Sequence, residues 1–133
     1  MTIAKLANIK TINEDLVIPR GVDYQQLFTI IDRDDNAAFD FTTGTTTGIT
    51  SIAIGAKIKQ YPGDVSFAGT FSVSFQSQTN GIIKISLTDT QVDKLKRGRY
   101  FYDVLVTLEN KPDSDEAGDL HSIRVAQGQI IVE

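Results

Sequence analysis

Hydrophobic and polar residues alternate along much of the chain, and a period of two predicts β-strands. The clearest alternation lies between Lys96 and Glu109, where every even-numbered position from residue 100 onward is hydrophobic: Tyr100, Tyr102, Val104, Val106 and Leu108. The odd positions of this run mix charged residues with Phe101 and Leu105. The pattern therefore predicts a central strand that is packed fully on one side, around which the other strands assemble.

Shorter alternations predict further strands at Leu16 to Ile18, Tyr24 to Asp32, Ile52 to Tyr61, Phe71 to Gln76, Ile83 to Leu87, Leu120 to Val125 and Gly128 to Val132. The last two segments are interpreted as two strands or as one bent strand. Turn-forming residues separate the strands, and Asn80-Gly81 is the strongest hairpin signal among them. Between residues 88 and 95, the capping-box spacing of Thr88 and Gln91 predicts a single helical turn.

Seven to nine short strands with turns between them favour an all-β fold, an immunoglobulin-like antiparallel β-sandwich. In such a sandwich a helical turn precedes the sixth strand, which matches the position of residues 88 to 95 here. Tyr100 or Tyr102 would then donate its hydroxyl to upstream backbone, although both tyrosines are equally compatible with simple core filling. We expect residues 16 to 133 to form this domain and residues 1 to 15 to form an N-terminal arm.

Composition narrows the class of protein. A chain of 133 residues suits one domain with a core of its own. It contains no cysteine, which excludes disulfides and thiolate metal sites. A formal charge of −4 argues against a protein whose main task is binding nucleic acid or an anionic membrane. No segment has the pattern of a signal peptide or the hydrophobic length of a membrane span.

Candidate catalytic and metal-binding residues are few. His121 is the only histidine, and no Gly-x-Ser-x-Gly motif accompanies it, so Ser/His catalysis is not expected. Asp32, Asp34 and Asn36 have the alternation of a calcium loop, but Ala37 and Thr43 occupy the positions that require Gly and Glu, and we interpret the segment as a turn. No catalytic, cofactor-binding or metal-binding residue is assigned.

Two charged clusters remain. One is acidic and is interpreted as a solvated loop: Asp113, Asp115, Glu116 and Asp119. The other is basic and surrounds the predicted helical turn: Lys94, Lys96, Arg97 and Arg99. The basic residues have the charge to contact phosphate or a negative partner. No exposed aromatic residues are interleaved with them, so charge at a helix C-terminus explains them more simply.

Four segments together resemble a known family: Pro19-Arg20-Gly21-Val22-Asp23-Tyr24, Gly81 to Leu87, Leu95-x-x-Gly98-Arg99-Tyr100-x-Tyr102-Asp103-Val104, and Arg124-Val125-x-x-Gly128-x-Ile130-x-Val132. The family is the immunoglobulin-like domain of tailed-bacteriophage virion proteins, typified by the N-terminal domain of baseplate upper proteins. The resemblance covers residues 16 to 133. The chain departs from the family where Val22 interrupts the usual Arg-Gly-Asp, and in its N-terminal arm and its Thr/Gly-rich segment at residues 42 to 51.

The resemblance implies a small, non-enzymatic virion component: a tail, neck or baseplate protein or a head decoration protein, assembled in the host cytoplasm. Its implied partners are other virion proteins and copies of itself in a homo-oligomer or array, without nucleic acid, membrane or cofactor. Residues 1 to 13 are expected to contact a neighbour. The alternative is a carbohydrate-binding or adhesive module recognising a cell surface, for which Phe39, Phe41 and Tyr61 are the candidate aromatic residues. An esterase or glycosidase is a third, much weaker hypothesis.

Overall fold

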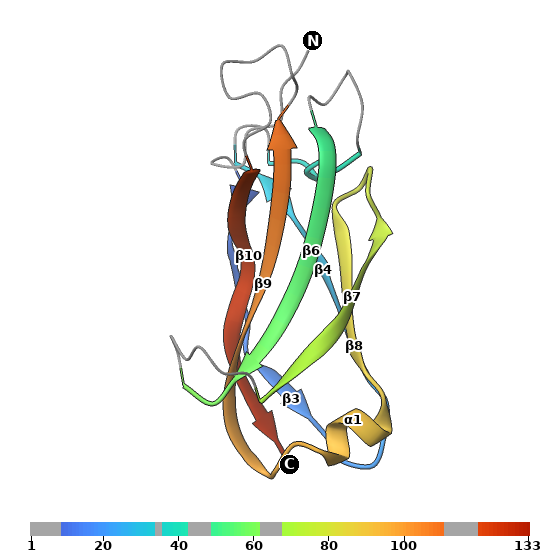
Figure 1. The fold of residues 1–133 in the computed structure, drawn as a ribbon, viewed down its shortest axis with the longest axis vertical. Helices are drawn as coiled ribbons and strands as arrows, with labels where there is room; N and C mark the ends of the chain where they lie inside the picture. Colours follow the sequence, from blue (N-terminus) through green and yellow to red (C-terminus); the bar gives the residue numbers. More distant parts are fainter. Residues whose placement is uncertain (1–8, 34–35, 43–48, 62–67, 111–119) are drawn as a thin grey trace.

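The computed structural model describes residues 9–33, 36–42, 49–61, 68–110 and 120–133, and this part of the chain is predominantly β-strand. Eight strands form one sheet in the order β2-β10-β9-β6-β7-β8-β4, with β3 also paired to β10 (Figure 1). These strands are β2 (Ile12–Asn13), β3 (Leu16–Ile18), β4 (Tyr24–Thr29), β6 (Ile49–Lys59), β7 (Gly69–Ser77), β8 (Ile82–Leu87), β9 (Gly98–Asn110) and β10 (Leu120–Val132). A small second sheet pairs β1 (Ile9–Lys10) with β5 (Ile31–Asp32).

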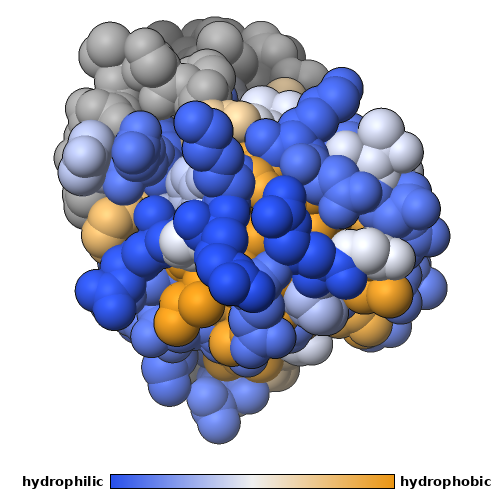
Figure 2. Space-filling model, turned by 90° about the horizontal axis from the view of Figure 1, so that it is seen from below, coloured by the Kyte–Doolittle hydropathy of each residue, from blue (hydrophilic) through white to orange (hydrophobic). Residues whose placement is uncertain are grey.

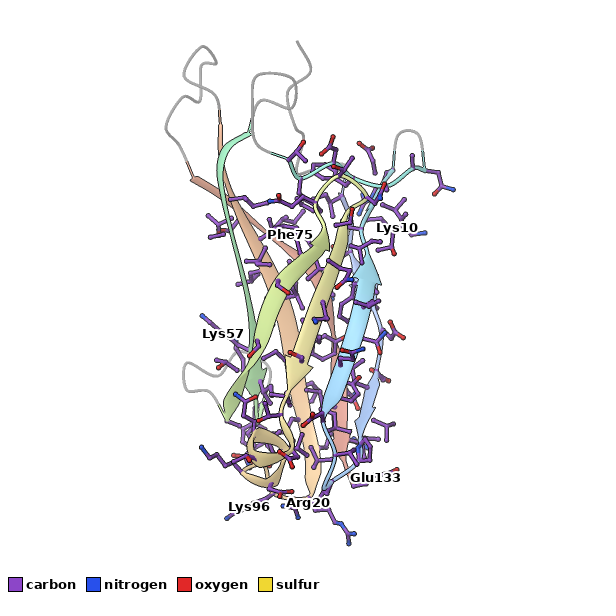
Figure 3. The ribbon with its side chains drawn as sticks, turned by 90° about the vertical axis from the view of Figure 1, so that its right-hand side faces the viewer. Lys10, Arg20, Lys57, Phe75, Lys96 and Glu133 are labelled. Carbon is purple, nitrogen blue, oxygen red and sulfur yellow. The ribbon has the colours of Figure 1, made fainter. Side chains whose placement is uncertain are left out.

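The eight-stranded sheet curls into a nearly closed barrel around a hydrophobic interior. Phe28 in β4 stacks on Tyr102 in β9 with ring centroids 6.3 Å apart, although β4 and β9 are not neighbours in the sheet. Phe71 in β7 approaches the same tyrosine edge-on, also at 6.3 Å. Figure 3 shows side chains filling the space enclosed by the strands. The all-β expectation is therefore confirmed.

Strand β9 is the central element, as its alternation predicts. It pairs antiparallel with β6 along one edge and with β10 along the other, almost from end to end. The even-numbered residues Tyr100, Tyr102, Val104 and Val106 are all buried; the side chain of Leu108 lies outside the described part. A strand with neighbours on both edges and one fully buried face leaves only its other face for polar chemistry.

The helical turn before β9 also forms as predicted. Helix α1 (Asp89–Asp93) begins at Thr88, and both hydrogen bonds of the capping box with Gln91 are present. Just after the helix, the Tyr100 hydroxyl donates to the carbonyl oxygen of Lys96 at 2.9 Å. Of the two tyrosines considered from the sequence, Tyr100 is therefore the one that bonds nearby upstream backbone. It joins the start of β9 to the segment that follows α1.

The described part has ten strands, more than the seven to nine expected, because one predicted strand is divided and the expected arm contributes two short strands. Tyr24 to Asp32 ends as β4 at Thr29, since the Ile30 N–H donates to Gly81 and the Ile30 carbonyl accepts from Phe39. The chain then continues as β5, which pairs with β1 instead of β8. The expected arm contains β1 and β2, the strand predicted at Leu16 to Ile18 forms as β3, and Ile9 is fully buried. Residues 9 to 15 of the expected arm therefore pack on the sheet, and residues 1 to 8 lie outside the described part.

The hairpin between β7 and β8 forms at Asn80-Gly81, and the position of Gly81 can only accommodate glycine. Its φ is +65°, and an added Cβ would lie 2.6 Å from the Phe39 carbonyl oxygen. The close approach lets Phe39 and Phe41 pack beside the hairpin, where the ring centroids of Phe41 and Phe75 are 5.2 Å apart.

The only helix in the described part is five residues long. No helix in that part has the length and apolarity to cross a membrane.

Replacing Gly81 by alanine should destabilise the fold strongly. The left-handed conformation disfavours any side chain, and the added Cβ would collide with backbone, so we expect a loss of at least about 2 kcal/mol in the free energy of unfolding. Urea denaturation followed by circular dichroism measures the loss. Gly55→Ala is the matched control: nothing lies within 4 Å of a Cβ at residue 55, so its stability should be nearly unchanged. Equal stability of the two variants would contradict the role of Gly81.

Candidate functional site

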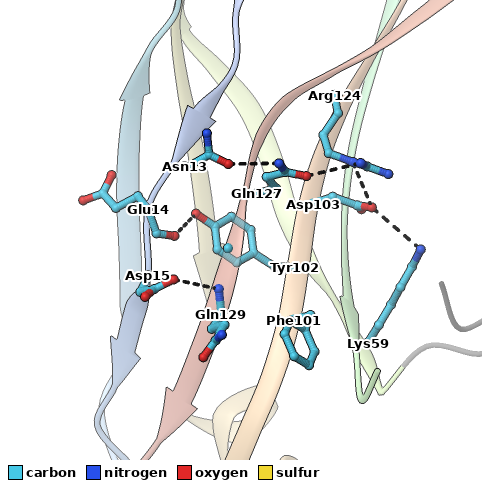
Figure 4. A pocket seen from close by; sticks show the side chains of 11 residues that line it. Asn13, Glu14, Asp15, Lys59, Phe101, Tyr102, Asp103, Arg124, Gln127 and Gln129 are labelled. Carbon is cyan, nitrogen blue, oxygen red and sulfur yellow. Dashed lines mark hydrogen bonds and ion pairs between the residues drawn. The ribbon is translucent and has the colours of Figure 1, made fainter. Parts of the chain in front are cut away.

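A groove lies on the outer face of β6, β9 and β10, beside the N-terminal strand β2 (Figure 4). Its volume is about 600 Å³, and it is open to solvent. Polar residues dominate its lining: Asn13, Glu14, Asp15, Lys59, Phe101, Tyr102, Asp103, Arg124, Gln127, Gly128 and Gln129. Because it gathers carboxylates, cations and amides in one place, this groove is the candidate site.

A chain of polar side chains crosses the groove from β2 to β6. The Gln127 amide donates to Asn13 Oδ1 at 2.9 Å, and Arg124 donates to Gln127 Oε1 at 3.2 Å. The Arg124 guanidinium is also 3.6 Å from Asp103 Oδ2, and Lys59 Nζ approaches the same oxygen at 3.7 Å from the opposite side. Figure 4 shows these contacts in one row. The row links side chains from four strands that backbone hydrogen bonds also join in order.

Asp103 is the centre of this row. It is 7% exposed and is the only charged residue that is buried in the described part. It occupies an odd position of β9, so its side chain points away from the core, where Lys59 and Arg124 from the flanking strands cover it. Its Oδ1 is buried without a hydrogen-bond partner among the described residues. One carboxylate thus lies between two cations, while one of its oxygens still has unused capacity to accept a hydrogen bond.

A β-bulge in β10 changes which of its side chains face the groove. The pairing of β10 with β9 shifts register between Arg124 and Ala126, and both Val125 and Ala126 are fully buried. The shift allows Arg124 and Gln127 to face the groove although they are three residues apart. The segment from Leu120 to Val132 is therefore a single strand with an irregularity, which decides between the two interpretations that the sequence allowed.

The N-terminal side of the groove is fastened to β10 by close backbone contacts. The Tyr102 hydroxyl donates to the Glu14 carbonyl oxygen at 2.6 Å, and the Glu14 N–H donates to the Gln127 carbonyl oxygen at 3.0 Å. Gly128 lies against the Glu14 carbonyl so closely that a Cβ there would overlap it. Asp15 adds a carboxylate that accepts from the Gln129 N–H at 3.0 Å. The wall formed by residues 13 to 15 is thus held by the sheet.

Burial makes the two tyrosines near this wall hard to ionise. The pKa of the Tyr102 phenol is raised well above its usual value, chiefly by burial and secondly by the nearby Glu14 carboxylate. The same two causes, in the same order, raise the pKa of Tyr24. A neutral Tyr102 can continue to donate its hydrogen bond to Glu14 throughout the physiological range.

The groove has the chemistry of a contact surface. Its lining contains carboxylates, amides, two cations and the half-buried ring of Phe101, and contains no Ser, Thr, Cys or His. Among the residues that the structure describes, no group of three or more His, Cys, Asp or Glu could hold a metal ion. These groups can form hydrogen bonds and ion pairs with a partner, and the lining contains no Ser/His or Cys/His pair for nucleophilic catalysis.

The residues examined from the sequence are scattered. The backbone of His121, in β10, pairs with Leu108 of β9, while the His121 side chain lies outside the described part. Asp32 belongs to a turn in which its carbonyl accepts from the Asn36 N–H, and Asn36 has a φ of +56°; Asp34 is not described. The acidic residues 113 to 119 are not described either. The structure therefore assembles no site from these residues.

The basic cluster stays on the surface at the end of the molecule that carries α1. Lys94, Lys96, Arg97 and Arg99 are all exposed. Figure 2 looks at this end of the molecule and shows strongly hydrophilic side chains with hydrophobic ones between them. A fifth cation, Arg20, is used structurally, because it donates to the carbonyl oxygens of Asp93 and Leu95 behind α1.

The aromatic residues proposed for glycan binding are mostly in the core. Phe39 is 4% exposed and Phe41 is fully buried, so neither faces solvent, whereas Tyr61 is 62% exposed. The expectation that Phe39 and Phe41 are free for a ligand is therefore wrong, because the Phe39-Phe41 segment packs against the β7–β8 hairpin.

Comparison with known proteins finds no relative: no protein-family model and no curated protein matches the chain.

The groove was not predicted from the sequence. The available signal was Asp103, a carboxylate in the middle of a run of hydrophobic residues. Its partners Lys59 and Arg124 are far away in the sequence, and only the pairing of β9 with β6 and β10 brings them together.

Asp103→Asn should destabilise the protein. The amide keeps the shape of the side chain but leaves the partly buried Lys59 and the half-exposed Arg124 without their counter-charge, so we expect a loss of about 1–2 kcal/mol in the free energy of unfolding. The loss is measured by urea denaturation, and should shrink at high salt. The control is Asp93→Asn, at an exposed carboxylate, which should change stability by less than about 0.5 kcal/mol. A stability of Asp103→Asn equal to that of this control would refute the bracing role.

Alkaline pH should unfold the chain through its buried tyrosines. A phenol whose pKa is raised by folding keeps its proton to higher pH in the folded state than in the unfolded state. Its contribution to the free energy of unfolding is therefore complete below about pH 10 and is lost progressively above it. The chain has four tyrosines and no tryptophan, which makes the ultraviolet absorbance of ionised tyrosine easy to follow. Tyr24 and Tyr102 should ionise only as the β-sheet circular dichroism disappears, and Tyr102→Phe should remove one of these late phenols. Ionisation of all four tyrosines with an unchanged sheet would contradict this prediction.

Proposed function

We propose that this protein is a non-enzymatic structural component of a bacteriophage virion, which works through contacts with copies of itself and with other virion proteins. The observation that carries the proposal is the distribution of exposed hydrophobic residues. Val17, Leu27 and Ile131, each 43% exposed or more, lie on strands β3, β4 and β10, and β3 and β4 end the sheet on its two sides. Hydrophobic side chains beside unpaired strand edges are suited to protein contacts.

We further propose that the domain is an immunoglobulin-like sandwich. Strand β7 supports this, because residues 69–71 pair with β6 whereas residues 72–77 pair with β8. One strand thus passes between a layer containing β6, β9 and β10 and a layer containing β4 and β8. The hydrogen bond from Tyr100 to a carbonyl four residues upstream is the other support, since it matches the tyrosine corner of that fold. This fold agrees with the family that the sequence resembles.

The groove fits a contact role better than a reaction. Three of its charged side chains, Lys59, Asp103 and Arg124, are already paired with one another in the row, which also links the strands that carry them. A rigid polar surface of this kind suits an interface, where side chains that are held in place lose little entropy on binding. Repeated copies would then add many modest contacts to a stable assembly.

The direct test is electron cryomicroscopy of the native assembly. A purified phage particle should contain the chain in symmetry-related copies, with its sheet edges or its groove against neighbouring proteins. If the chain never sediments with particles and is found only as a free protein, the proposal fails. Mass spectrometry of the particle fraction gives the same answer without an image.

The N-terminal arm provides a second test. Ile9 is buried and Ile12 and Asn13 pair with β10, so a deletion that reaches residue 13 would damage the sheet. Deleting residues 2 to 8 leaves these contacts intact and should preserve the thermal unfolding midpoint while reducing incorporation into particles. Incorporation of the shortened chain at the wild-type level would exclude a role of these residues in assembly.

A further inference from the structure

Strand β4 has one edge that no described strand covers. It pairs with β8 through all six of its residues, and it stands last in the order of the sheet. Gln25, Leu27 and Thr29 are exposed, and Leu27 is 48% exposed. The Gln26 side-chain amide donates to the Leu27 carbonyl oxygen at 3.2 Å, and a carbonyl oxygen has a second lone pair for a bond from a neighbouring strand. In Figure 3, Lys10 lies near the upper end of this strand.

The direction of the backbone groups along β4 follows from the residue after it. The Ile30 N–H donates to the carbonyl oxygen of Gly81, on the side of β8. Because backbone groups alternate in direction along an antiparallel strand, the other even-numbered residues of β4 also point toward β8. Gln25, Leu27 and Thr29 therefore direct their N–H and C=O groups to the open edge. These are three donors and three acceptors in a regular row.

The edge of β4 lacks the features that usually prevent edge-to-edge pairing, namely charges, prolines and bulges. Its sequence Tyr-Gln-Gln-Leu-Phe-Thr is uncharged, and its register with β8 is uninterrupted. Three other strands with an open edge in the described part are shorter or irregular. Strand β3 has three residues and is followed by Pro19, and β6 and β7, which diverge from each other (Figure 1), each carry a register shift.

We propose that β4 pairs with β4 of a second copy, antiparallel about a two-fold axis, to give one continuous sheet across the dimer. This inference names an interface for the assembly role proposed above and rests on that role. Residues that lie opposite each other must face the same side of a pleated sheet, so the axis must pass through a residue position. An axis at Leu27 places Leu27 beside its own copy and Gln25 beside Thr29, which allows about six backbone hydrogen bonds.

Charges at the two ends of the strand favour the same arrangement. The uncharged stretch is preceded by the exposed Asp23, and at its other end the exposed Lys10 pairs with Ile31 of β5. Antiparallel pairing brings Asp23 of one copy toward Lys10 of the other, twice in each dimer. The two copies therefore meet without like-charge repulsion along β4 and with opposite charges at both ends. The exposed Leu27 becomes covered at the axis.

Sedimentation of the full-length chain tests the interface. Over a concentration series up to about 1 mM, a range that detects weak association, the wild-type chain should pass from monomer to dimer. Leu27→Lys places two ammonium groups side by side at the axis and should raise the dissociation constant at least about tenfold. Ser72→Lys is the control, since it adds the same charge at an exposed residue of β7, in the same sheet but away from the β4 edge. It should leave the dissociation constant of the dimer unchanged. A wild-type chain that stays monomeric throughout, or equal effects of both variants, overturns the inference.

Cysteine cross-linking tests the register, because the natural chain contains no cysteine. Leu27→Cys should form a disulfide-linked dimer on mild oxidation, since directly opposed residues have Cα atoms about 5.5 Å apart. Gln25→Cys is the matched control: the two residues 25 lie about 13 Å apart along the strands and should not cross-link above background. Stronger cross-linking at Gln26→Cys, or equal cross-linking at 25 and 27, would overturn the proposed axis.

The same variant separates this inference from the proposed function. If the chain occurs in symmetric particles and Leu27→Cys does not cross-link there, the copies meet through another surface and only the interface is wrong. If the chain is absent from particles, the virion role is wrong even when the β4 dimer forms in solution.

Discussion

The structure depends on the hydrogen bonding of β9 along both of its edges. A strand whose backbone is satisfied by β6 on one side and β10 on the other can bury one face completely without leaving polar backbone groups unpaired. Tyr100, Tyr102, Val104 and Val106 occupy that face, and Phe28 and Phe71 from other strands pack on Tyr102. The remaining strands are arranged so that they cover this face.

The opposite face of β9 carries a buried carboxylate, that of Asp103. Asp103 is buried there because the long side chains of Lys59 and Arg124 fold over it from both neighbouring strands. A buried carboxylate of this kind adds little net stability compared with a hydrophobic residue, but removing one partner leaves charge without compensation. The row from Asn13 to Lys59 therefore fixes the relative positions of four strands more than it strengthens the fold.

The N-terminal segment is joined to the same system through backbone contacts. The Tyr102 hydroxyl donates to the Glu14 carbonyl oxygen and Gly128 lies against it, while the Asp15 carboxylate accepts from the Gln129 N–H. Core packing, the groove and the attachment of the chain's beginning thus share Tyr102, which has its ring in the interior and its hydroxyl at the edge of the barrel. The middle of the molecule is therefore joined by many contacts, while the edge of β4 stays open.

Sequence patterning by itself determined the all-β class, the central strand, the capping box at Thr88 and Gln91 and the hairpin at Asn80-Gly81. These features depend on local rules, namely a period of two, side-chain bonds over three residues and the backbone freedom of glycine. Tertiary structure alone decided the groove, the burial of Phe39 and Phe41, the division of the β4–β5 segment and the open edge of β4. The reason is that each of these requires partners far away in the sequence: Asp103 meets Lys59 and Arg124 only after three strands have paired, and alternation along one strand does not tell which strand will lie beside it.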